Sequence, residues 1–177
     1  IQMHRLGDLV LTYPLLAWLS RQHPESPLWV VGEERFFSEL MELSPQAVYF
    51  PFSAAPQLRR SRFNSVINLS HRPEALGFAG CLETAELTAP SRNASGGTFI
   101  NGRWQLYRAS IVNNNRYNLF HWADMNALDS IPIGRMRSTA WPVPEEKTAA
   151  SSAHVGLFIG ASEEDKHPDA AFWAALA

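Results

Sequence analysis

The 177-residue sequence contains a single cysteine, Cys81, so the chain cannot form an internal disulfide. Cys81 lies in an apolar helical context, which is typical of a small buried residue, and one unpaired thiol fits a reducing compartment. Long apolar runs are missing too: none approaches the roughly 18 residues of a membrane-spanning helix, and no stretch has the pattern of a signal peptide. These features predict a cytoplasmic protein.

The sequence also has little charge of either sign. Charged residues make up 18% of the chain, and 15 Lys and Arg against 17 Asp and Glu give a net charge of −2. A nucleic-acid-binding domain or a polybasic membrane footprint needs a clear excess of basic residues. The charge balance therefore argues against nucleic acid as a partner, while a hydrophobic fraction of 46% is ordinary for a globular protein.

Two common cofactor signatures are missing from the sequence. The first predicted strand is followed by a lone glycine, Gly7, and not by the Gly-x-Gly-x-x-Gly loop of dinucleotide-binding oxidoreductases, so we rank that class of enzyme low. No cluster of His, Cys and carboxylate residues has metal-ligand spacing. We therefore expect neither a metal nor a cofactor.

The most informative stretch is the opening one, residues 1–14. It has the pattern of a buried strand, a short turn at Gly7 and an amphipathic helix, with Pro14 either in the first turn of that helix or distorting it. In an open α/β sheet, ligands bind in the crevice at the carboxyl ends of the strands. Asp8 would point its carboxylate into that crevice. Capping of the following helix is the alternative role for Asp8.

Beyond this stretch, predicted strands and helices alternate, which favours an α/β fold with a parallel sheet and right-handed crossovers. The predicted strands are residues 28–32, 47–50 and 65–69, with a short edge strand over 84–88. The predicted helices are residues 33–43, 74–83, 104–112 and 117–128, and residues 91–97 form a loop by composition.

Two further polar sites follow from this pattern. The strand over 65–69 runs directly into a loop that holds His71 and Arg72, and by the crevice argument both would lie beside Asp8. An ordinary exposed loop is the alternative. His121 lies among apolar positions of the helix predicted over 117–128, where a lone histidine is usually a buried core residue.

A second strand–loop–helix unit lies at the end of the sequence. Residues 154–160 indicate a strand, the next loop holds Ala161, Ser162 and Lys166, and a helix begins near Pro168. The stretch before this unit is rich in Pro, Ala and Ser, which predicts an interdomain linker. We therefore expect a first domain over 1–130, a linker over 131–152 and the first unit of a truncated second domain over 153–177.

The two units together resemble glycosyltransferase family 9, the heptosyltransferase-like enzymes of lipopolysaccharide assembly. In that family the opening strand is followed by Gly-Asp, a short apolar run and Pro, as are Gly7, Asp8 and Pro14 here. Its second domain opens with a strand, a Gly-Ala-Ser-like triplet and a loop lysine, as residues 160–166 do here. The family often has Trp-Pro after that lysine, whereas this chain has His167-Pro168.

The resemblance implies the N-terminal half of a two-domain, GT-B-type glycosyltransferase with Rossmann-like parallel sheets. Its reaction would be an inverting, metal-independent transfer of a heptose or related sugar from an ADP-linked donor to a lipid-linked lipopolysaccharide core acceptor. The full enzyme would work in the cytoplasm, in peripheral contact with the inner membrane.

The resemblance also assigns roles to particular residues. Asp8 would be the general base. Lys166, Ser162 and Ala161 would bind the donor phosphates, and the acceptor site would include His71, Arg72, His121 and Gly7. The Asp-x-Gly-x-x-His motif that holds the donor in the family is not found in this sequence, so we expect the chain alone to be inactive. A non-catalytic saccharide-binding module is the alternative function.

Overall fold

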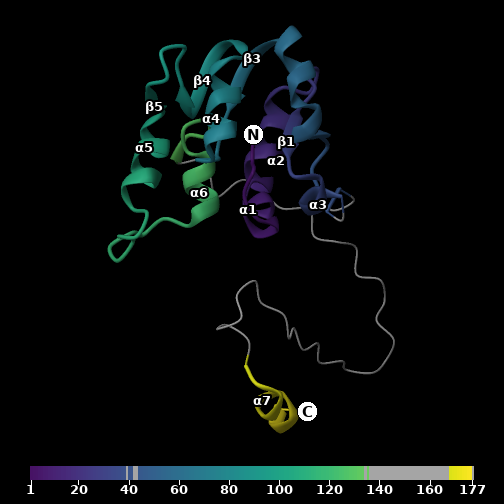
Figure 1. Cartoon of the computed structure of the whole chain (residues 1–177), viewed down its shortest axis with the longest axis vertical. Coiled ribbons are helices and arrows are strands. Elements are labelled where there is room, and N and C mark those ends of the chain that lie inside the picture. The colour runs from purple at the N-terminus through teal and green to yellow at the C-terminus, as the bar shows by residue number, and fades with distance from the viewer. Residues whose placement is uncertain (39, 42–43, 134, 136–167, 177) are drawn as a thin grey trace. The chain divides into compact units, whose positions relative to one another are not determined.

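Helices and short strands alternate in the part of the chain that the structure describes, namely residues 1–38, 40–41, 44–133, 135 and 168–176. In this computed structural model the described residues up to 135 belong to one unit, drawn from purple to green in Figure 1. Helix α7 (Ala170–Leu176) belongs to a second unit. The strand predicted over 154–160, its loop and most of the predicted linker lie outside the described residues.

The strands of the first unit form two small sheets with parallel pairing in each. One sheet pairs β1 (Trp29–Gly32) with β2 (Val48–Pro51) in parallel. The other holds β3 (Arg62–Ile67), β4 (Glu83–Arg92) and β5 (Thr98–Asn101), with β3 parallel and β5 antiparallel to β4. The strands predicted over 28–32, 47–50 and 65–69 are thus confirmed, whereas the strand predicted at the start of the chain is present only as a bridge at Gln2; the fold is mixed α/β.

The predictions for residues 84–97 are partly wrong. Strand β4 lies between β3 and β5, so it is not an edge strand. Ser91 and Arg92, predicted as loop, continue β4 and pair with β5. The turn between these strands is held by the Asn93 side chain, whose Oδ1 accepts a hydrogen bond from Gly97 N over 2.7 Å. A tight turn of this kind allows a hairpin that the loop composition alone does not reveal.

The opening residues connect the two sheets. Gln2 forms a parallel bridge with Gly32 at the end of β1. On its other side, Ile1 N donates to Ile67 O over 2.6 Å, and Leu69 N donates to Ile1 O over 2.9 Å. The order across these contacts is β2, β1, the opening segment, β3, β4 and β5. This order is compatible with a Rossmann-like sheet, in which the chain leaves the central strand toward both sides.

Two helices follow the opening segment directly. These are α1 (Leu6–Val10) and α2 (Tyr13–Gln22), and Pro14 lies in the first turn of α2, where its missing N–H costs no helical hydrogen bond. This confirms one of the two alternatives for Pro14. The predicted turn at Gly7 is wrong, because Gly7 is inside α1 and its φ is not positive.

The remaining described α-helices of the first unit are all shorter than predicted, and they are joined by a 3₁₀ helix, η2, over residues outside the predicted helices. They are α3 (Glu34–Phe37), the 3₁₀ helix η2 (Phe52–Arg60), α4 (Pro73–Gly80), α5 (Arg103–Ser110) and α6 (Trp122–Ala127). The helix predicted over 117–128 begins only at Trp122. Before it, Asn118 Oδ1 accepts from Phe120 N over 3.0 Å, a local side-chain bond that competes with helix formation.

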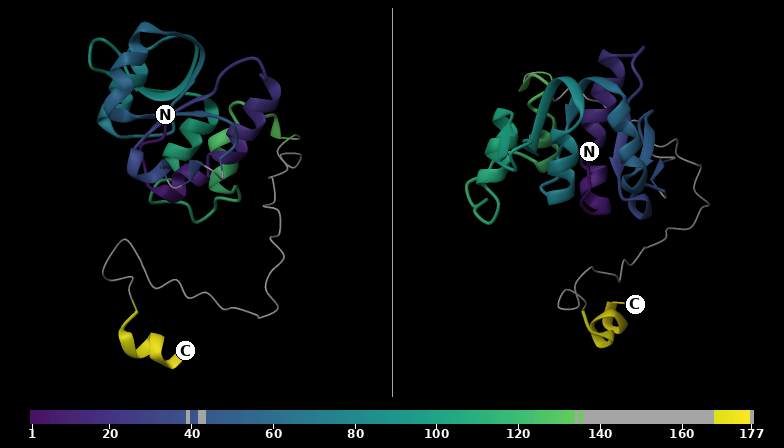
Figure 2. Two further views of the ribbon diagram at one scale, coloured as in Figure 1. Left: turned by 90° about the vertical axis from the view of Figure 1, so that its right-hand side faces the viewer. Right: turned by 45° about the horizontal axis from the view of Figure 1, so that its top comes forward.

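Buried side chains form a core on both faces of the sheets, whose ribbon Figure 2 shows from two further sides. Neighbouring residues of a strand point to opposite faces, and in β1 Val30 packs with α1, α2 and α3 while Val31 packs with η2 and α4. A third cluster joins α2, α6 and the loop after β3 through Leu15, Leu69 and Ala127. Cys81, predicted to be buried, is exposed at the end of α4, because the apolar face of that helix ends before it.

Candidate functional site

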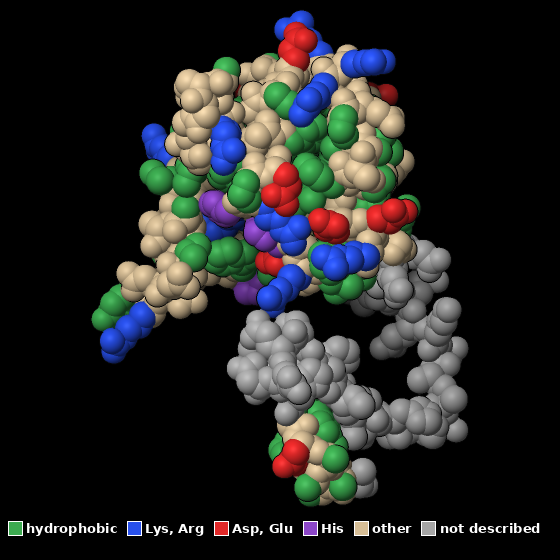
Figure 3. All heavy atoms as spheres, viewed as in Figure 1, with side chains coloured by type: hydrophobic (Ala, Val, Ile, Leu, Met, Phe, Trp, Pro, Cys, Tyr) green, Lys and Arg blue, Asp and Glu red, His purple; other side chains and the backbone are tan. Residues whose placement is uncertain are grey.

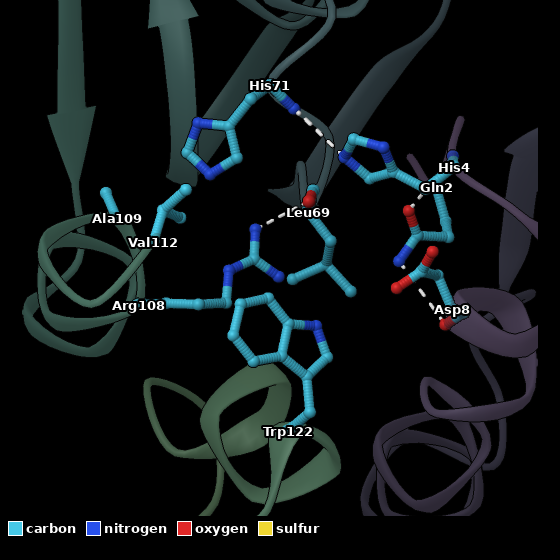
Figure 4. A pocket seen from close by; sticks show the side chains of 9 residues that line it. All are labelled: Gln2, His4, Asp8, Leu69, His71, Arg108, Ala109, Val112 and Trp122. Carbon is cyan, nitrogen blue, oxygen red and sulfur yellow. Dashed lines mark hydrogen bonds between the residues drawn. The ribbon is translucent and has the colours of Figure 1, made fainter. Parts of the chain in front are cut away.

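A pocket of about 590 Å³ opens where the opening segment and β3 end (Figure 4). Its walls come from the loops after these two segments and from α1, α5 and α6. The lining residues are Gln2, His4, Asp8, Leu69, His71, Arg108, Ala109, Val112 and Trp122. The two segments are neighbours at the point where the chain reverses its direction of travel across the sheet, which is where open α/β sheets bind ligands.

Asp8 is half-buried and lies on the wall of this pocket (Figure 4). Its Oδ2 accepts a hydrogen bond from Arg5 N at the start of α1 over 3.2 Å, and its main-chain oxygen accepts one from Gln2 Nε2 over 3.4 Å. Asp8 thus supports the helix start and faces the pocket at once. An ionised carboxylate has about four acceptor positions, so the bond to Arg5 leaves capacity for a ligand hydroxyl.

His71 lies in the same pocket as Asp8, as the crevice argument predicts. Its main-chain N–H donates to His4 Nε2 over 3.3 Å, which ties the loop after β3 to the loop after the opening segment. Because Nε2 accepts this bond, the His4 ring is neutral with its proton on Nδ1. Partial burial lowers the pKa of both histidines; the Arg108 charge lowers both further, and Asp8 opposes the effect at His4.

The loop that carries His71 is shaped by a buried amide. Asn68 is fully buried, and its Nδ2 donates to Ser70 O over 3.0 Å and to Pro90 O over 2.7 Å. Its Oδ1 accepts from Ser70 N over 2.9 Å. These bonds satisfy the polar groups that the chain exposes as it leaves β3. They hold the loop against β4 and present His71 at the pocket.

Three other predicted acceptor residues lie elsewhere. Arg72 is not among the lining residues, and its Nη1 forms an ion pair with Glu33 Oε1 at 3.0 Å. Gly7 is exposed on α1, and a Cβ there would meet no atom within 4 Å. His121 is exposed and its ring nitrogen accepts from Ala123 N over 3.3 Å at the start of α6, so the expectation of a buried core histidine is wrong.

The predicted donor-phosphate residues are not described. Ala161, Ser162 and Lys166 lie outside the described ranges, and their role stays a prediction. Among the residues that are described, no group of three His, Cys, Asp or Glu side chains could hold a metal ion. In the same residues, no helix combines the length and the apolar character that crossing a bilayer requires.

Arg108 is one of the pocket residues that the sequence does not predict. It lies on α5 and is only 1% exposed. Its Nη1 donates to Asn126 Oδ1 and its Nη2 to Leu69 O, each over 2.5 Å. The guanidinium also lies 5.7 Å from the ring centroid of Trp122, within the range of a cation–π contact. Arg108 therefore joins α5, α6 and the loop after β3 at the back of the pocket.

The sequence gives no signal for Arg108 because α5 places polar residues inside. Gln105 and Arg108, one turn apart, are 0% and 1% exposed, while Leu106 between them is 59% exposed. Hydrophobic periodicity assigns the apolar positions of a helix to the core. On α5 that rule selects the wrong face. His4 and Trp122 are likewise not predicted from the sequence, because neither belongs to the Gly7-Asp8 motif or to the loop of His71.

Comparisons with known proteins do not identify the function of this pocket. No protein-family model matches the chain, and no curated protein or solved structure matches it. The resemblance to glycosyltransferase family 9 therefore rests on the sequence motifs alone.

The charges of the pocket come from two residues with opposite signs. Burial lowers the pKa of Arg108 to about 10, although Asp8 and Asp129 act in the other direction, so Arg108 is charged at neutral pH. Figure 3 shows histidine side chains among acidic and basic ones on the face viewed there. A carboxylate, two imidazoles and a buried cation in one pocket offer charges of both signs and hydrogen-bonding groups to a polar ligand.

Proposed function

We propose that the pocket is the acceptor site of a glycosyltransferase and that Asp8 is its general base. The observation that carries this proposal is the position of the Asp8 carboxylate on the pocket wall, opposite the loop of His71, at the carboxyl ends of adjacent parallel segments. The Gly7-Asp8 and Pro14 motif of family 9 supports it further. In this proposal the chain is the N-terminal, Rossmann-like half of a GT-B-type enzyme.

The proposed reaction is a single displacement with inversion. The acceptor hydroxyl attacks the anomeric carbon of the donor and its proton passes to Asp8. The bond from that carbon to the donor phosphate oxygen breaks, and the nucleoside diphosphate leaves with the electron pair. Lys166, Ser162 and Ala161 would stabilise the leaving phosphate, as charge and N–H groups at such positions do. The proposed donor is an ADP-linked heptose or related sugar, and the proposed acceptor is a lipid-linked saccharide core.

The test is sugar transfer from ADP-heptose to a lipid-linked core saccharide, assayed with this chain and with the longer natural protein that the proposal implies. We expect no turnover by the chain alone and turnover by the natural protein. Asp8→Asn in the natural protein should lower turnover at least about 100-fold, the contribution of a general base, and leave acceptor binding intact. Asn still accepts the bond from Arg5 N, so the variant removes the charge and keeps the helix start.

Asp124→Asn is the matched control. Asp124 is the third residue of α6, as Asp8 is of α1, and it does not line the pocket. Undiminished turnover in Asp8→Asn would overturn the assignment of the base. Acceptor binding without turnover in the unmodified natural protein would instead favour a non-catalytic saccharide-binding module.

A further inference from the structure

The Arg108 guanidinium is a buried positive charge whose partners are neutral. It binds the amide oxygen of Asn126 and the main-chain oxygen of Leu69, and its Nε has no hydrogen-bond partner among the described residues. A buried charge carries a large desolvation penalty unless an opposite charge compensates it. Within the described ranges no carboxylate lies close enough to Arg108 to form an ion pair.

Two carboxylates, those of Asp129 and Asp8, raise the pKa of Arg108 from a distance, but each accepts hydrogen bonds from main-chain N–H groups and not from Arg108. Asp129 accepts from Trp104 N and Gln105 N, each over 3.0 Å, at the start of α5. Asp8 accepts from Arg5 N at the start of α1. Both raise the pKa of Arg108 without pairing with it. Among the described residues, the countercharge of Arg108 is therefore incomplete.

The orientation of Arg108 is fixed by the elements around it. Asn126, which accepts from Nη1, also donates through Nδ2 to Leu11 O over 3.3 Å, so the acceptor is itself anchored. Trp122 covers the guanidinium at 5.7 Å. In Figure 4 Arg108 lies with Ala109 and Val112 at one side of the pocket, and Asp8 lies with Gln2 at the other. A ligand in the pocket thus meets positive charge at one end and a carboxylate at the other.

We infer that the pocket binds a saccharide that carries an oxyanion, either a carboxylate or a phosphate ester, and that Arg108 supplies the charge that selects it. His71, which lines the same pocket, offers a ring N–H to the anion. The hydroxyl that reacts would lie at the Asp8 end. This inference rests on the proposed function only in naming the ligand as a saccharide, because anion binding needs no transfer.

The experiment is an NMR titration of the unmodified 177-residue chain at pH 7, following the imidazole resonances of His4 and His71. The probes are glucose and its two acidic counterparts, glucuronic acid and glucose 6-phosphate, with inorganic phosphate as the free anion. We expect each acidic sugar to bind at least about 10-fold more tightly than glucose, the factor that corresponds to 1.4 kcal/mol. Preference for one acidic sugar over the other identifies the anion as carboxylate or phosphate.

Two variants separate recognition from structure. Arg108→Gln should reduce the preference for the acidic sugars to less than about twofold, while Arg103→Gln, the same change at an exposed position of α5, should leave it unchanged. If Arg108→Gln does not fold, His71→Gln on the exposed loop replaces it and should weaken the acidic sugars selectively.

Equal binding of glucose and the acidic sugars by the unmodified chain would overturn the inference, as would equal losses in Arg108→Gln and Arg103→Gln. Tighter binding of inorganic phosphate than of either acidic sugar would also contradict it, because the site would then select a free anion. Transfer activity is not measured in this titration. A preference for acidic sugars together with no transfer by the natural protein would therefore contradict the proposed function and support this inference.

Discussion

The Asp8 carboxylate combines two interactions, although Asp8 is not the helix N-cap that the sequence offers as its alternative role: Arg5 is the N-cap of α1 and Asp8 is its third residue. Its bond to Arg5 N supports the start of α1, and its place on the pocket wall exposes it to a ligand. The first interaction orients the side chain for the second, because it fixes one oxygen and with it the plane of the carboxylate. In the proposed reaction, a residue that is held in this way would need little reorganisation to accept a proton.

Gly80 and Gly7 differ in the space that surrounds them, so the lack of a side chain matters at only one of the two positions. A Cβ on Gly80, the last residue of α4, would lie 1.9 Å from Arg92 O, so α4 packs against β4 only without it. A Cβ on Gly7 would meet no atom within 4 Å. We expect Gly80→Ala to lower the free energy of unfolding by about 1–3 kcal/mol, as overpacking does. Gly7→Ala should raise it by about 0.5–1 kcal/mol, since alanine favours a helix.

Urea unfolding of both variants measures these changes, and each serves as the control for the other. Destabilisation by Gly7→Ala would show that the glycine is needed for the fold. Weaker acceptor binding in a Gly7→Ala variant that unfolds normally would support the role that the family resemblance gives to Gly7.

At the scale of the element, α5 depends on a residue far along the chain. Gly102, at its N-cap, has φ +110° and no side chain to accept the first N–H groups. Asp129 accepts from Trp104 N and Gln105 N instead. Removal of a capping side chain costs about 0.5–2 kcal/mol, so Asp129→Ala should lower the free energy of unfolding by that amount.

Thermal or urea unfolding of Asp129→Ala and Asp129→Asn tests this role. The asparagine variant keeps one acceptor oxygen and should lose less stability than the alanine variant. Glu86→Ala, an exposed change on β4, is the control. Equal stability of Asp129→Ala and the unmodified chain would show that the two N–H groups find other acceptors.

The elements differ in how well the sequence predicts them. Strands β1, β2 and β3 follow from short apolar runs, and α5 is predicted within one or two residues at each end. Strand β5 and the late start of α6 depend on side-chain bonds of Asn93 and Asn118, which hydrophobic periodicity does not register. The order of the strands cannot be predicted from the sequence, because it depends on the opening segment pairing with β1 on one side and with the end of β3 on the other.

The residues of the pocket also differ in how well the sequence predicts them. Asp8 and His71 are predicted together because both follow strands that end at the same edge of the sheet. Arg108 comes to that edge on a helix whose inner face is polar, so only the tertiary structure reveals it. Positions at strand ends can thus be inferred from order along the chain, whereas residues supplied by the facing helices cannot.

At the scale of the whole molecule, the pocket and the hydrophobic core both depend on Leu69. The side chain of Leu69 packs in the cluster with Leu15 and Ala127, while its carbonyl oxygen holds Arg108. A change in the charge of the pocket should therefore change the free energy of unfolding. The two pocket histidines allow this coupling to be measured through pH.

The pKa of each histidine is lowered in the folded protein. His4 faces Asp8, Arg108 and Arg72, and His71 faces Arg108 and His4. Below about pH 6.5, the usual histidine pKa, the unfolded chain binds protons that the folded chain does not. Proton binding then favours unfolding, so the two histidines should make the free energy of unfolding fall from about pH 6.5 downward, and their contribution should level off below their lowered pKa values. The buried amino group of Ile1, whose pKa burial lowers from 8.0 to about 5, adds a fall that begins near pH 8 and is common to all the variants.

Urea unfolding at intervals from pH 8 to pH 5 measures this dependence, above the range in which most carboxylates titrate. Protonation of His4 also removes the acceptor for the His71 N–H, which adds a loss of contact between the two loops. The double variant His4→Gln, His71→Gln should be less sensitive to pH in this window, whereas His23→Gln, at the exposed end of α2, should keep the slope. An unchanged slope in the double variant would place the titrating groups outside the pocket and separate its charge from the stability of the fold.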